Sequence, residues 1–399
     1  MTKPTNHISD NDDFLKRYLP GKSGAMVELR RNIMLLNQNI NRDLIRNVLI
    51  TGESGSGKNR VAQVIAGHRQ WKLENPRTKA GDLGAKLTVD HGKYAETSLP
   101  GLPGDLMESE LFGYKKSAFT GAEKDRPGYL AQEYDDLLLD EIGDVPMPLQ
   151  SKLLRVLNDG MFRPLGGLPD DEQETSSRIL MATNRDLFRM CREKKFREDL
   201  LWRMREFVIS VPPLRDQADA IETIADNILK EIVIKRDINL EVGDPDSTFE
   251  TYAHTCQNKD YQIPILPVAD LDFARAYEWP GNVRHLHHAI MRWLVSQGKK
   301  AFQNCAQEIE SELVQSRFIE NNFREQVFQM LDDAIKLGRP VAQTPNDYID
   351  SNFLLPVREA LVEYIDQKSP RPRVLESMFP GYKDANSLRT TIGKWRKKQ

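Results

Sequence analysis

The stretch Gly52-Glu53-Ser54-Gly55-Ser56-Gly57-Lys58 decides the fold, because it matches the G-x-x-x-x-G-K pattern of a phosphate-binding loop. It follows the apolar run Asn47-Val48-Leu49-Ile50 and precedes a helical pattern, the strand–loop–helix context that the motif requires. Its glycines let backbone N–H groups curl around a polyphosphate, the helix N-terminus adds positive potential, and Lys58 reaches the β- and γ-phosphate oxygens. A chance glycine-rich turn is the alternative, and Asn59 stands where Ser or Thr usually binds Mg²⁺.

A second motif, Leu137-Leu138-Leu139-Asp140-Glu141, places two carboxylates at the end of a buried strand. Asp140 can hold Mg²⁺ through water, and Glu141 can orient or polarise the water that attacks a γ-phosphate. An acidic strand end that only caps the next element is the alternative. Joined to the phosphate-binding loop upstream, the catalytic interpretation is favoured.

Further polar residues follow in the next segments. Asn184 ends a third strand, where its amide can position the lytic water or sense the γ-phosphate. Arg197 and Arg203 lie six positions apart in Phe196-Arg197-Glu198-Asp199-Leu200-Leu201-Trp202-Arg203, so on a continuous helix they point to different sides. At least one of the two can serve as an arginine finger on the nucleotide of a neighbouring subunit. Solvated surface arginines are the alternative.

The apolar runs predict an α/β fold with a parallel sheet covered by helices, because they are apolar on both faces and alternate with helical patterns. The predicted strands are 47–50, 87–89, 137–139, 179–182 and 207–209. Leu149, Leu153, Leu154 and Leu157 follow one face of a helix that Gly160 ends. Beyond Pro212-Pro213 the pattern turns helical, over 220–234, 268–277 and 283–295, with a polar insertion or long loop between 237 and 262.

Composition excludes several classes of protein. The chain has 399 residues and a net charge of −3, and its three cysteines lie far apart, so a disulfide framework, a zinc finger and a histone-like binder are all disfavoured. No apolar run approaches the roughly 18 residues of a membrane span, and the N-terminus has no apolar core of a secretion signal. We expect a cytoplasmic, multi-domain α/β protein.

These motifs together resemble the AAA+ central domain of bacterial enhancer-binding proteins, the activators of sigma-54 RNA polymerase, over about residues 22 to 297. The most specific part is Glu110-Leu111-Phe112-Gly113 followed by a version of the family's GAFTGA loop, which contacts sigma-54. The resemblance implies a partner-binding loop of Ser117, Ala118, Phe119, Thr120, Gly121 and Ala122. An exposed Phe is an apolar tip suited to a partner, and an ordinary surface turn leaves that Phe unexplained.

The resemblance also implies individual roles. Phe196 to Met204 is similar to the family's FREDLYYRL segment, which makes Arg197 and Arg203 the finger arginines. Pro212-Pro213-Leu214-Arg215 looks like the start of the lid, and Trp279-Pro280-Gly281-Asn282-Val283-Arg284 is similar to WPGNVREL, which makes Arg284 the sensor II arginine. The implied nucleotide-binding set is Gly52, Glu53, Ser54, Gly55, Ser56, Gly57, Lys58, Asn59 and Arg284, with Glu141, Asp140, Asn184, Arg197 and Arg203 as the catalytic set.

Four positions depart from the family pattern. Ser117 replaces the first Gly of the loop, which is expected to stiffen its hinge or to weaken coupling to sigma-54. Asn59 replaces a common Glu, and Asp90 occupies the position of the Asn that restrains the catalytic Glu. Arg163-Pro164-Leu165-Gly166 only approximates the family's RVGG. His285, His287 and His288 invite a metal interpretation, but without evident partners we place them on a helix surface.

The C-terminal segment is strongly basic. Between Asp366 and Gln399, nine Lys and Arg face three Asp and Glu, a balance of 9 − 3 = +6. Three short helices are predicted, and their arrangement looks like the helix-turn-helix tail by which the family binds upstream enhancer DNA. The predicted DNA-binding residues are Arg389, Lys394, Arg396, Lys397 and Lys398. A basic helix that only solubilises the end is the alternative.

The predicted organisation follows from these segments. We expect a polar N-terminal tail (1–21), an AAA+ α/β ATPase subdomain (22–212), a helical lid (213–300), a helical linker (301–346) and a helix-turn-helix DNA-binding region (347–399). Only 51 residues precede Gly52 and about half belong to the ATPase fold, so a receiver domain of about 100 residues has no room. We therefore expect control in trans, by a regulatory protein or by expression level.

The leading hypothesis is a ring-forming activator, a hexamer by resemblance, that hydrolyses ATP with Mg²⁺ and remodels sigma-54 RNA polymerase holoenzyme from the closed to the open promoter complex. The alternative is a DNA-bound AAA+ switch or scaffold with a weak or repurposed ATPase, which the residues at positions 59, 90 and 117 would support. A replication-type AAA+ loader is a distant third, because it leaves the SAFTGA sequence unexplained.

Overall fold

The computed structural model describes residues 12–38, 44–74, 89–90, 92–99, 104–237, 250–256 and 259–311. The chain divides into two compact units, Met1–Ala306 and Gln307–Gln399, and every helix and strand named below belongs to the first. The predicted DNA-binding residues, from Arg389 to Lys398, lie outside the described residues. None of the helices in the described part of the chain is long and apolar enough to cross a membrane.

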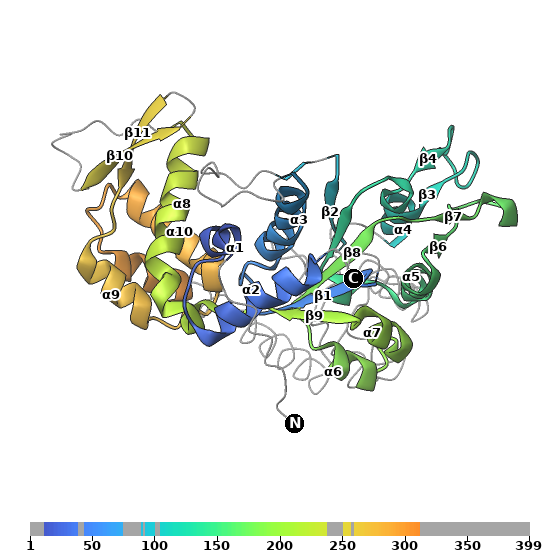
Figure 1. The fold of residues 1–399 in the computed structure, drawn as a ribbon, viewed down its shortest axis with the longest axis horizontal. Coiled ribbons are helices and arrows are strands. Elements are labelled where there is room, and N and C mark those ends of the chain that lie inside the picture. The colour runs from blue at the N-terminus through green and yellow to red at the C-terminus, as the bar shows by residue number, and fades with distance from the viewer. Residues whose placement is uncertain are drawn as a thin grey trace, which may run out of the picture. The chain divides into compact units, whose positions relative to one another are not determined.

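A five-stranded parallel sheet forms the centre of the first unit (Figure 1). Its order is β2 (Tyr94–Ser98), β5 (Asp136–Asp140), β8 (Arg178–Thr183), β1 (Asn47–Thr51) and β9 (Phe207–Ser210). The predicted runs at β1, β5, β8 and β9 are confirmed. The prediction at 87–89 is wrong, since Val89 is described outside any strand and the edge strand is Tyr94–Ser98; Leu87 and Thr88 lie outside the described residues.

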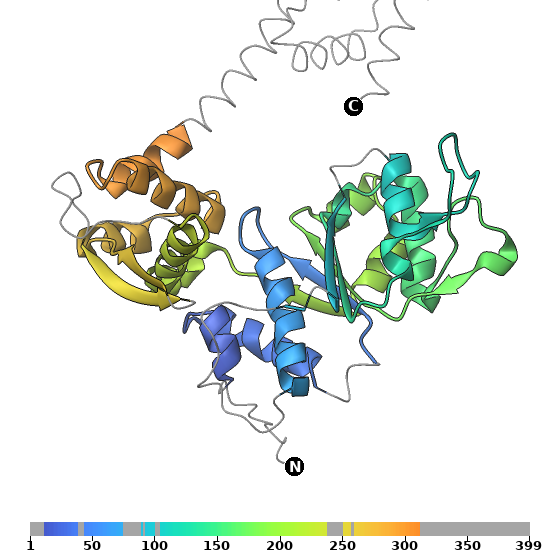
Figure 2. The same ribbon diagram turned by 90° about the horizontal axis from the view of Figure 1, so that it is seen from above.

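Two cores cover the two faces of this sheet, because successive strand residues point to opposite sides. On one face Leu137 and Leu139 pack with α5 (Met147–Asp159) and α7 (Glu198–Met204). On the other face Leu138 packs with α2 (Gly24–Leu36) and α3 (Lys58–Glu74). Figure 2 shows these layers from above. The remaining helices of the first face are α4 (Gly104–Phe112) and α6 (Leu187–Arg192).

Helix α5 confirms the predicted apolar face, on which Leu149, Leu153 and Leu157 are buried. Gly160 ends the helix with a φ of 74°, the left-handed conformation that glycine adopts at little cost, and its N–H donates to the carbonyl of Val156. The C-terminus of α5 lies beside the start of β1, because the Asn47 side chain donates to the Leu157 carbonyl.

The N-terminal residues are not a polar tail throughout, which corrects the prediction for 1–21. Residues Asp13–Tyr18 form helix α1, in which Phe14 and Tyr18 are buried. Asp12 caps the helix by accepting from the Leu15 N–H at 3.1 Å, and its other oxygen lies 2.8 Å from Nε2 of the buried His68. Burial lowers the pKa of His68, although the hydrogen bond to Asp12 opposes this. The few apolar residues of this segment therefore serve as an anchor on α3.

The helical part after the sheet contains η6 (Leu214–Ala220), α8 (Ile221–Lys235), α9 (Val268–Ala276) and α10 (Asn282–Val295), which confirms the three predicted helices. The polar stretch 237–262 is not simply a loop, because β10 (Thr251–Cys256) and β11 (Lys259–Pro264) pair as an antiparallel hairpin. Ile263 is buried, and the Tyr252 hydroxyl donates to Asp226 of α8 at 2.5 Å. These contacts hold the hairpin on the helices.

Two small hairpins project from the sheet near α4 and α5. The first pairs β3 (Gly113–Tyr114) with β4 (Arg126–Pro127), and the second pairs β6 (Met161–Phe162) with β7 (Gln173–Glu174). Short 3-10 turns occur at η3 (Tyr129–Ala131), η4 (Ile142–Asp144) and η5 (Pro169–Asp171), and residues 302–311 are helical as well.

Candidate nucleotide site

The loop between β1 and α3 has the backbone of a phosphate cradle. Gly55 and Gly57 have φ values of 73° and 97°, which glycine adopts readily. A Cβ on Gly52 would lie 2.9 Å from the carbonyl oxygen of Val211, so no larger residue fits there without movement. The buried hydroxyl of Ser56 has no hydrogen-bond partner in the described structure. An unpaired hydroxyl in a glycine loop at a helix N-terminus fits a bound phosphate.

Lys58 and Asp140 meet at this loop. The Lys58 ammonium donates to the carbonyls of Gly52 and Glu53 at 3.1 and 3.0 Å. Burial lowers the pKa of Lys58, and the nearby Asp140 carboxylate opposes that shift. The Asn59 amide donates to Asp140 Oδ2 at 2.9 Å, so the residue that departs from the usual pattern touches the predicted Mg²⁺ ligand.

Glu141 and Asn184 lie at the same edge of the sheet. Parallel pairing aligns Leu139 of β5 with Met181 of β8, and Thr183 of β8 with Thr51 of β1, so the residues that follow these strands come together. Glu141 has a φ of 56°, and its N–H donates to Asp140 Oδ1. This left-handed turn directs the chain away from the strand immediately after the two carboxylates.

Asp90 cannot restrain Glu141, which corrects the prediction for that position. Its carbonyl accepts from the N–H groups of Lys93 and Tyr94, so it lies at the amino end of β2, whereas Glu141 follows the carboxyl end of β5. The strand between these ends spans about 13 Å. The register instead pairs Ser98 with Asp140. Ser98 is thus the β2 residue beside the carboxylates, and sequence spacing alone had not identified it.

The helical part closes over the phosphate-binding loop through Glu53. The Glu53 carboxylate accepts two hydrogen bonds from Arg215, at 3.0 and 2.6 Å, and one from Asn282 at 3.1 Å. Asn282 also donates to the Ser54 carbonyl and accepts from the Leu214 N–H. This set of contacts, here called the lid clamp, joins the phosphate-binding loop to residues more than 160 positions farther along the chain.

Arg284, the predicted sensor II arginine, lies within the lid contacts at the start of α10. Its guanidinium donates to the Ser54 hydroxyl at 3.3 Å, and a Cβ on Gly55 would meet the Gly281 carbonyl oxygen at 2.3 Å. The lid backbone therefore approaches this glycine so closely that a side chain would push it away. Arg284 was predicted at this site from the sequence. Arg215 and Asn282 were not, although both belong to segments that resemble the lid of the family.

Acidification should weaken the lid clamp. The hydrogen bonds from Arg215 and Asn282 lower the pKa of Glu53 to about 2, below its ordinary 4.5. A lowered pKa means that the contribution to stability is present above about pH 4.5 and is lost as the pH falls toward 2. Because the pair is largely exposed, we expect about 1 kcal/mol or less. The free energy of unfolding, measured in urea, should fall less on acidification for Glu53→Gln than for the wild type or for the exposed-site control Glu28→Gln. Equal decreases in all three would contradict the clamp.

The SAFTGA loop forms the tip of the β3–β4 hairpin. The Ser117 N–H donates to the Ala122 carbonyl at 2.8 Å, and the Ala122 N–H donates to the Phe119 carbonyl at 3.0 Å. Phe119 is 45% exposed and contacts only the ring of Tyr114 among the described aromatic pairs, with centroids 5.0 Å apart. The loop thus presents an apolar tip to solvent, with Thr120 exposed beside it.

The second hairpin supports the base of this loop. The Lys115 N–H donates to the Leu165 carbonyl, and the Lys115 ammonium pairs with Asp125 and Asp171 at 3.3 and 2.9 Å. A Cβ on Gly166 would lie 2.7 Å from that of Ala118, so the two loops touch at this glycine. Arg163 lies in this second loop, and its guanidinium is 3.9 Å from Glu172.

Ser117→Gly should steady the loop rather than loosen it. Ser117 has a φ of 67°, a conformation that costs a residue with a Cβ about 1–2 kcal/mol, partly offset by the greater freedom of glycine in the unfolded chain. We expect a net gain of about 0.5–1 kcal/mol in local stability, measured as slower hydrogen exchange of the residue-117 amide that bonds to Ala122. Ser117→Ala, which keeps a Cβ, is the control, and faster exchange in the glycine variant would refute the strain.

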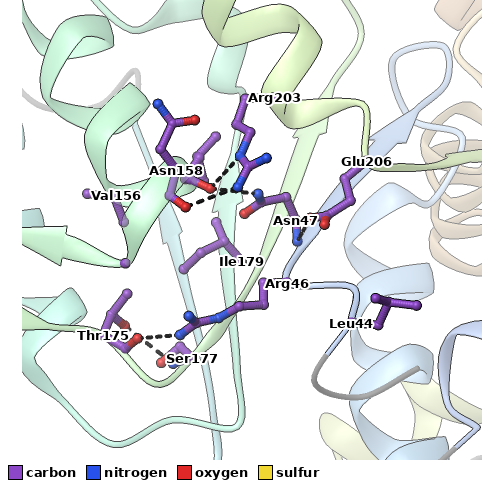
Figure 3. A pocket seen from close by; sticks show the side chains of 12 residues that line it. Leu44, Arg46, Asn47, Val156, Asn158, Thr175, Ser177, Ile179, Arg203 and Glu206 are labelled. Atoms are coloured by element: carbon purple, nitrogen blue, oxygen red, sulfur yellow. Dashed lines mark hydrogen bonds between the residues drawn. The ribbon is translucent and has the colours of Figure 1, made fainter. Parts of the chain in front are cut away.

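The two candidate finger arginines have different surroundings. Arg197 precedes α7 rather than lying within it, which corrects the assumption of a helix throughout; its guanidinium bonds to Asp199 and to the Ser151 hydroxyl. Arg203 lies in α7 and donates to the carbonyls of Leu157 and Asn158 at 2.8 and 3.0 Å (Figure 3). The Leu157 carbonyl also accepts from Asn47 at 3.0 Å, so Arg203 lies beside the amino end of β1.

The prediction that the three histidines of α10 lie on a helix surface is correct only in part. His285 is buried, packs edge-on against Trp279 with centroids 5.2 Å apart, and bonds through Nε2 to the Ala306 carbonyl at 3.0 Å. His288 is exposed, as predicted. Within the described residues, no group of three or more His, Cys, Asp or Glu side chains could hold a metal ion. A Mg²⁺ ion here would depend on phosphate oxygens in addition to Asp140.

The fold and site define a nucleotide-binding protein of the AAA+ class. The family profile of the sigma-54 interaction domain matches residues 19–210. The chain is 33% identical over 291 residues to the DNA-binding transcriptional regulator NtrC of Rhizobium meliloti (73% of this chain, 50% of NtrC). It is 37% identical over 290 residues to the alginate biosynthesis transcriptional regulatory protein AlgB of Pseudomonas aeruginosa (72% of this chain, 53% of AlgB). The chain therefore contains a sigma-54 interaction domain over residues 19–210, and it resembles these transcriptional regulators in this domain.

Solved structures agree with this fold. NtrX from Brucella abortus superposes with a TM-score of 0.50 and 26% identity, covering 72% of this chain and 54% of NtrX. A second structure of NtrX, in complex with ADP, superposes with a TM-score of 0.50 and 25% identity, covering 72% of this chain and 55% of NtrX. The predicted family and fold class are confirmed. The chain spans about half the length of the curated relatives it matches.

Proposed function

We propose that this protein hydrolyses ATP in a ring of identical subunits and uses the SAFTGA loop to remodel sigma-54 RNA polymerase holoenzyme at promoters, in the cytoplasm. One observation carries the proposal. A phosphate-binding loop, paired carboxylates and a lid arginine meet at one edge of the sheet, and the same domain carries an exposed aromatic loop tip. The match to the sigma-54 interaction domain supports both features, the nucleotide site and the partner-binding loop.

Different residues of the chain have different roles at the nucleotide site. The loop amides of residues 52–58 and the Lys58 ammonium bind the phosphates, and Arg284 reaches them from the lid. Glu141 polarises the attacking water, and Asn184 positions it. Asp140 would hold Mg²⁺, with Asn59 orienting its carboxylate, and the ion would neutralise phosphate charge.

A second copy of the chain must complete the site if Arg203 is a finger. Arg203 lies at the amino end of β1, and the phosphate-binding loop follows the carboxyl end, about 13 Å farther along the strand. Its guanidinium is therefore directed to a different edge of the sheet from its own nucleotide site. An arginine supplied by a neighbour is a recurrent device in nucleotide hydrolysis. A closed ring, a hexamer by family resemblance, would give every site such a neighbour.

Mixing two inactive variants tests this arrangement. Lys58→Ala removes phosphate binding and Arg203→Ala removes the finger, so each alone should have negligible ATPase activity. In a mixed ring, a site is active when its own subunit keeps Lys58 and its neighbour keeps Arg203, which predicts recovery of about a quarter of the sites. No recovery, with both variants shown to assemble, would place Arg203 outside the site. A protein that stays monomeric with ATP and promoter DNA would overturn the ring itself.

Enhancer DNA is the second proposed partner. The basic C-terminal segment, with Arg389, Lys394 and the 396–398 tail, supports binding to DNA phosphates, and a regulatory protein acting in trans would supply the signal. The scaffold alternative loses one of its supports, because Asp90 lies away from Glu141. The hydrogen bond from Asn59 to Asp140 also weakens this alternative, because Asn59 contacts the residue that we propose to hold Mg²⁺.

A further inference from the structure

The main chain of Glu53 belongs to the phosphate-binding loop, but its side chain faces the lid. The Glu53 carbonyl accepts from the Lys58 ammonium at 3.0 Å, which places the backbone of this residue at the phosphate cradle. Within the described residues, its carboxylate accepts hydrogen bonds from lid residues only: Arg215 bonds to both oxygens, and Asn282 bonds to one of them. The Glu53 side chain is therefore occupied by the lid.

Asn282 carries this contact to the start of α10. Asn282 is fully buried, and its amide nitrogen donates to the Glu53 carboxylate at 3.1 Å and to the Ser54 carbonyl at 3.0 Å. Its amide oxygen accepts from the Leu214 N–H at 2.8 Å. A buried amide with all of its groups paired is costly to displace. Asn282 thus fixes the first turn of α10 against the phosphate-binding loop.

Arg284 follows Asn282 by two residues on the same helix, so the position of Asn282 also decides where Arg284 lies. The Arg284 guanidinium donates to the Ser54 hydroxyl at 3.3 Å. Burial lowers the pKa of Lys58, and the nearby positive charge of Arg284 lowers it further. Because these two cations repel each other, Arg284 needs a constraint from outside to stay beside Lys58. The lid clamp supplies such a constraint.

The pair of Arg215 and Glu53 is suited to fixing geometry. The two bonds, at 3.0 and 2.6 Å, run from the two terminal nitrogens of one guanidinium to the two oxygens of one carboxylate. Such a bidentate pair sets the orientation of both side chains, which a single contact does not. The pair is largely exposed and therefore adds little to the stability of the fold. Its removal should change the position of the lid rather than unfold the protein.

We propose that Glu53 and Arg215 are positioning residues for Arg284: they hold the start of α10 so that the Arg284 guanidinium reaches the phosphates of the nucleotide. The Glu53 side chain then contributes to nucleotide binding without touching the nucleotide. A group that is held in place beforehand binds more tightly, because binding does not have to order it. This inference rests on the role of Arg284 in the proposed function.

Calorimetric titration of the full chain with a non-hydrolysable ATP analogue and Mg²⁺ tests the inference. We expect Glu53→Gln and Arg215→Gln each to weaken binding about fivefold, and Arg284→Ala about tenfold. The decisive measurement combines two substitutions. In the Arg284→Ala background, Arg215→Gln should weaken binding no further, because the residue that it positions is gone. Arg215→Lys keeps the charge but not the two parallel bonds, so its affinity should lie between those of the wild type and Arg215→Gln.

Arg275→Gln is the matched control. Arg275 is also a lid arginine, its side chain is 39% exposed against 38% for Arg215, and it bonds to Glu222 and Asp272 rather than to the phosphate-binding loop. This variant should bind the analogue as the wild type does.

Two results would overturn the positioning role. One is wild-type affinity in both Glu53→Gln and Arg215→Gln; if Arg284→Ala still weakens binding, the proposed function stands without this inference. The other is an equal effect of Arg215→Gln with and without the Arg284 side chain, which would show that the clamp acts by another route. Wild-type affinity in Arg284→Ala would instead overturn the role of Arg284 in the proposed function, and the inference with it.

Discussion

Glu141→Gln is expected to lower the rate of ATP hydrolysis about a hundredfold or more while leaving nucleotide affinity nearly unchanged. The substitution keeps the size of the side chain and removes only the charge that polarises water. Glu141 is placed by the left-handed turn directly after β5, and its N–H bonds to Asp140, so the backbone that positions it does not depend on the carboxylate. Steady-state phosphate release and equilibrium nucleotide binding measure the two quantities separately.

Glu133→Gln is the matched control for this experiment, because Glu133 is exposed and precedes the same strand without reaching its carboxyl end. The control should hydrolyse ATP at the wild-type rate. Equal and negligible rates for the wild type and Glu141→Gln would instead favour the DNA-bound scaffold, in which the ATPase is inert.

Thr120→Ala is expected to reduce open-complex formation to background while sparing ATP hydrolysis. Thr120 is exposed at the tip of the β3–β4 hairpin, beside Phe119 and away from the nucleotide contacts, so its side chain is available to a partner and not to the chemistry. A central contact residue at a protein interface is worth about 2 kcal/mol or more, which corresponds to a loss of about thirtyfold in binding. A reconstituted transcription assay with sigma-54 RNA polymerase measures the outcome.

A pull-down of sigma-54 with an ATP transition-state mimic separates binding from later steps. The wild type should retain sigma-54 in this state, and Thr120→Ala should not. Thr223→Ala, an exposed threonine on α8, is the control and should behave as the wild type in both assays. Full transcription by Thr120→Ala would refute the role of the loop, and loss of ATPase activity in this variant would show that the loop also supports the nucleotide site.

Local patterns were enough to predict the centre of this fold. The phosphate-binding loop is encoded in consecutive residues, since Gly55 and Gly57 need positive φ values that few other residues adopt readily. The runs at β1, β5 and β8 are recognisable because strands buried on both faces must be apolar throughout. Asp140 and Glu141 follow directly from such a run. Their proximity to Lys58 was predictable as well, because parallel strands bring their carboxyl ends to one edge.

Register and long-range contacts could not be predicted in this way. The edge strand β2 has only two buried residues, Tyr94 and Thr97, and their spacing does not alternate, so Tyr94–Ser98 gave little signal of a strand. Asp90 was therefore assigned to a position that the pairing gives to Ser98. The sequence of helix α1 looks polar, yet Asp12 bonds to His68 and Phe14 stacks on Trp71, each more than fifty residues away. The lid clamp joins Glu53 with Asn282, 229 positions apart.

The sequence by itself determined that the chain carries a nucleotide loop, a pair of carboxylates and a SAFTGA tip, because each depends on neighbouring residues whose backbone conformation or apolar burial is fixed locally. Only the tertiary structure decided which side chains stand beside them: Ser98 next to Asp140, Arg215 on Glu53, and Arg203 at the far end of β1. These contacts arise when separate elements pack and strands take a register. The type of a single polar residue does not indicate which distant residue it will contact.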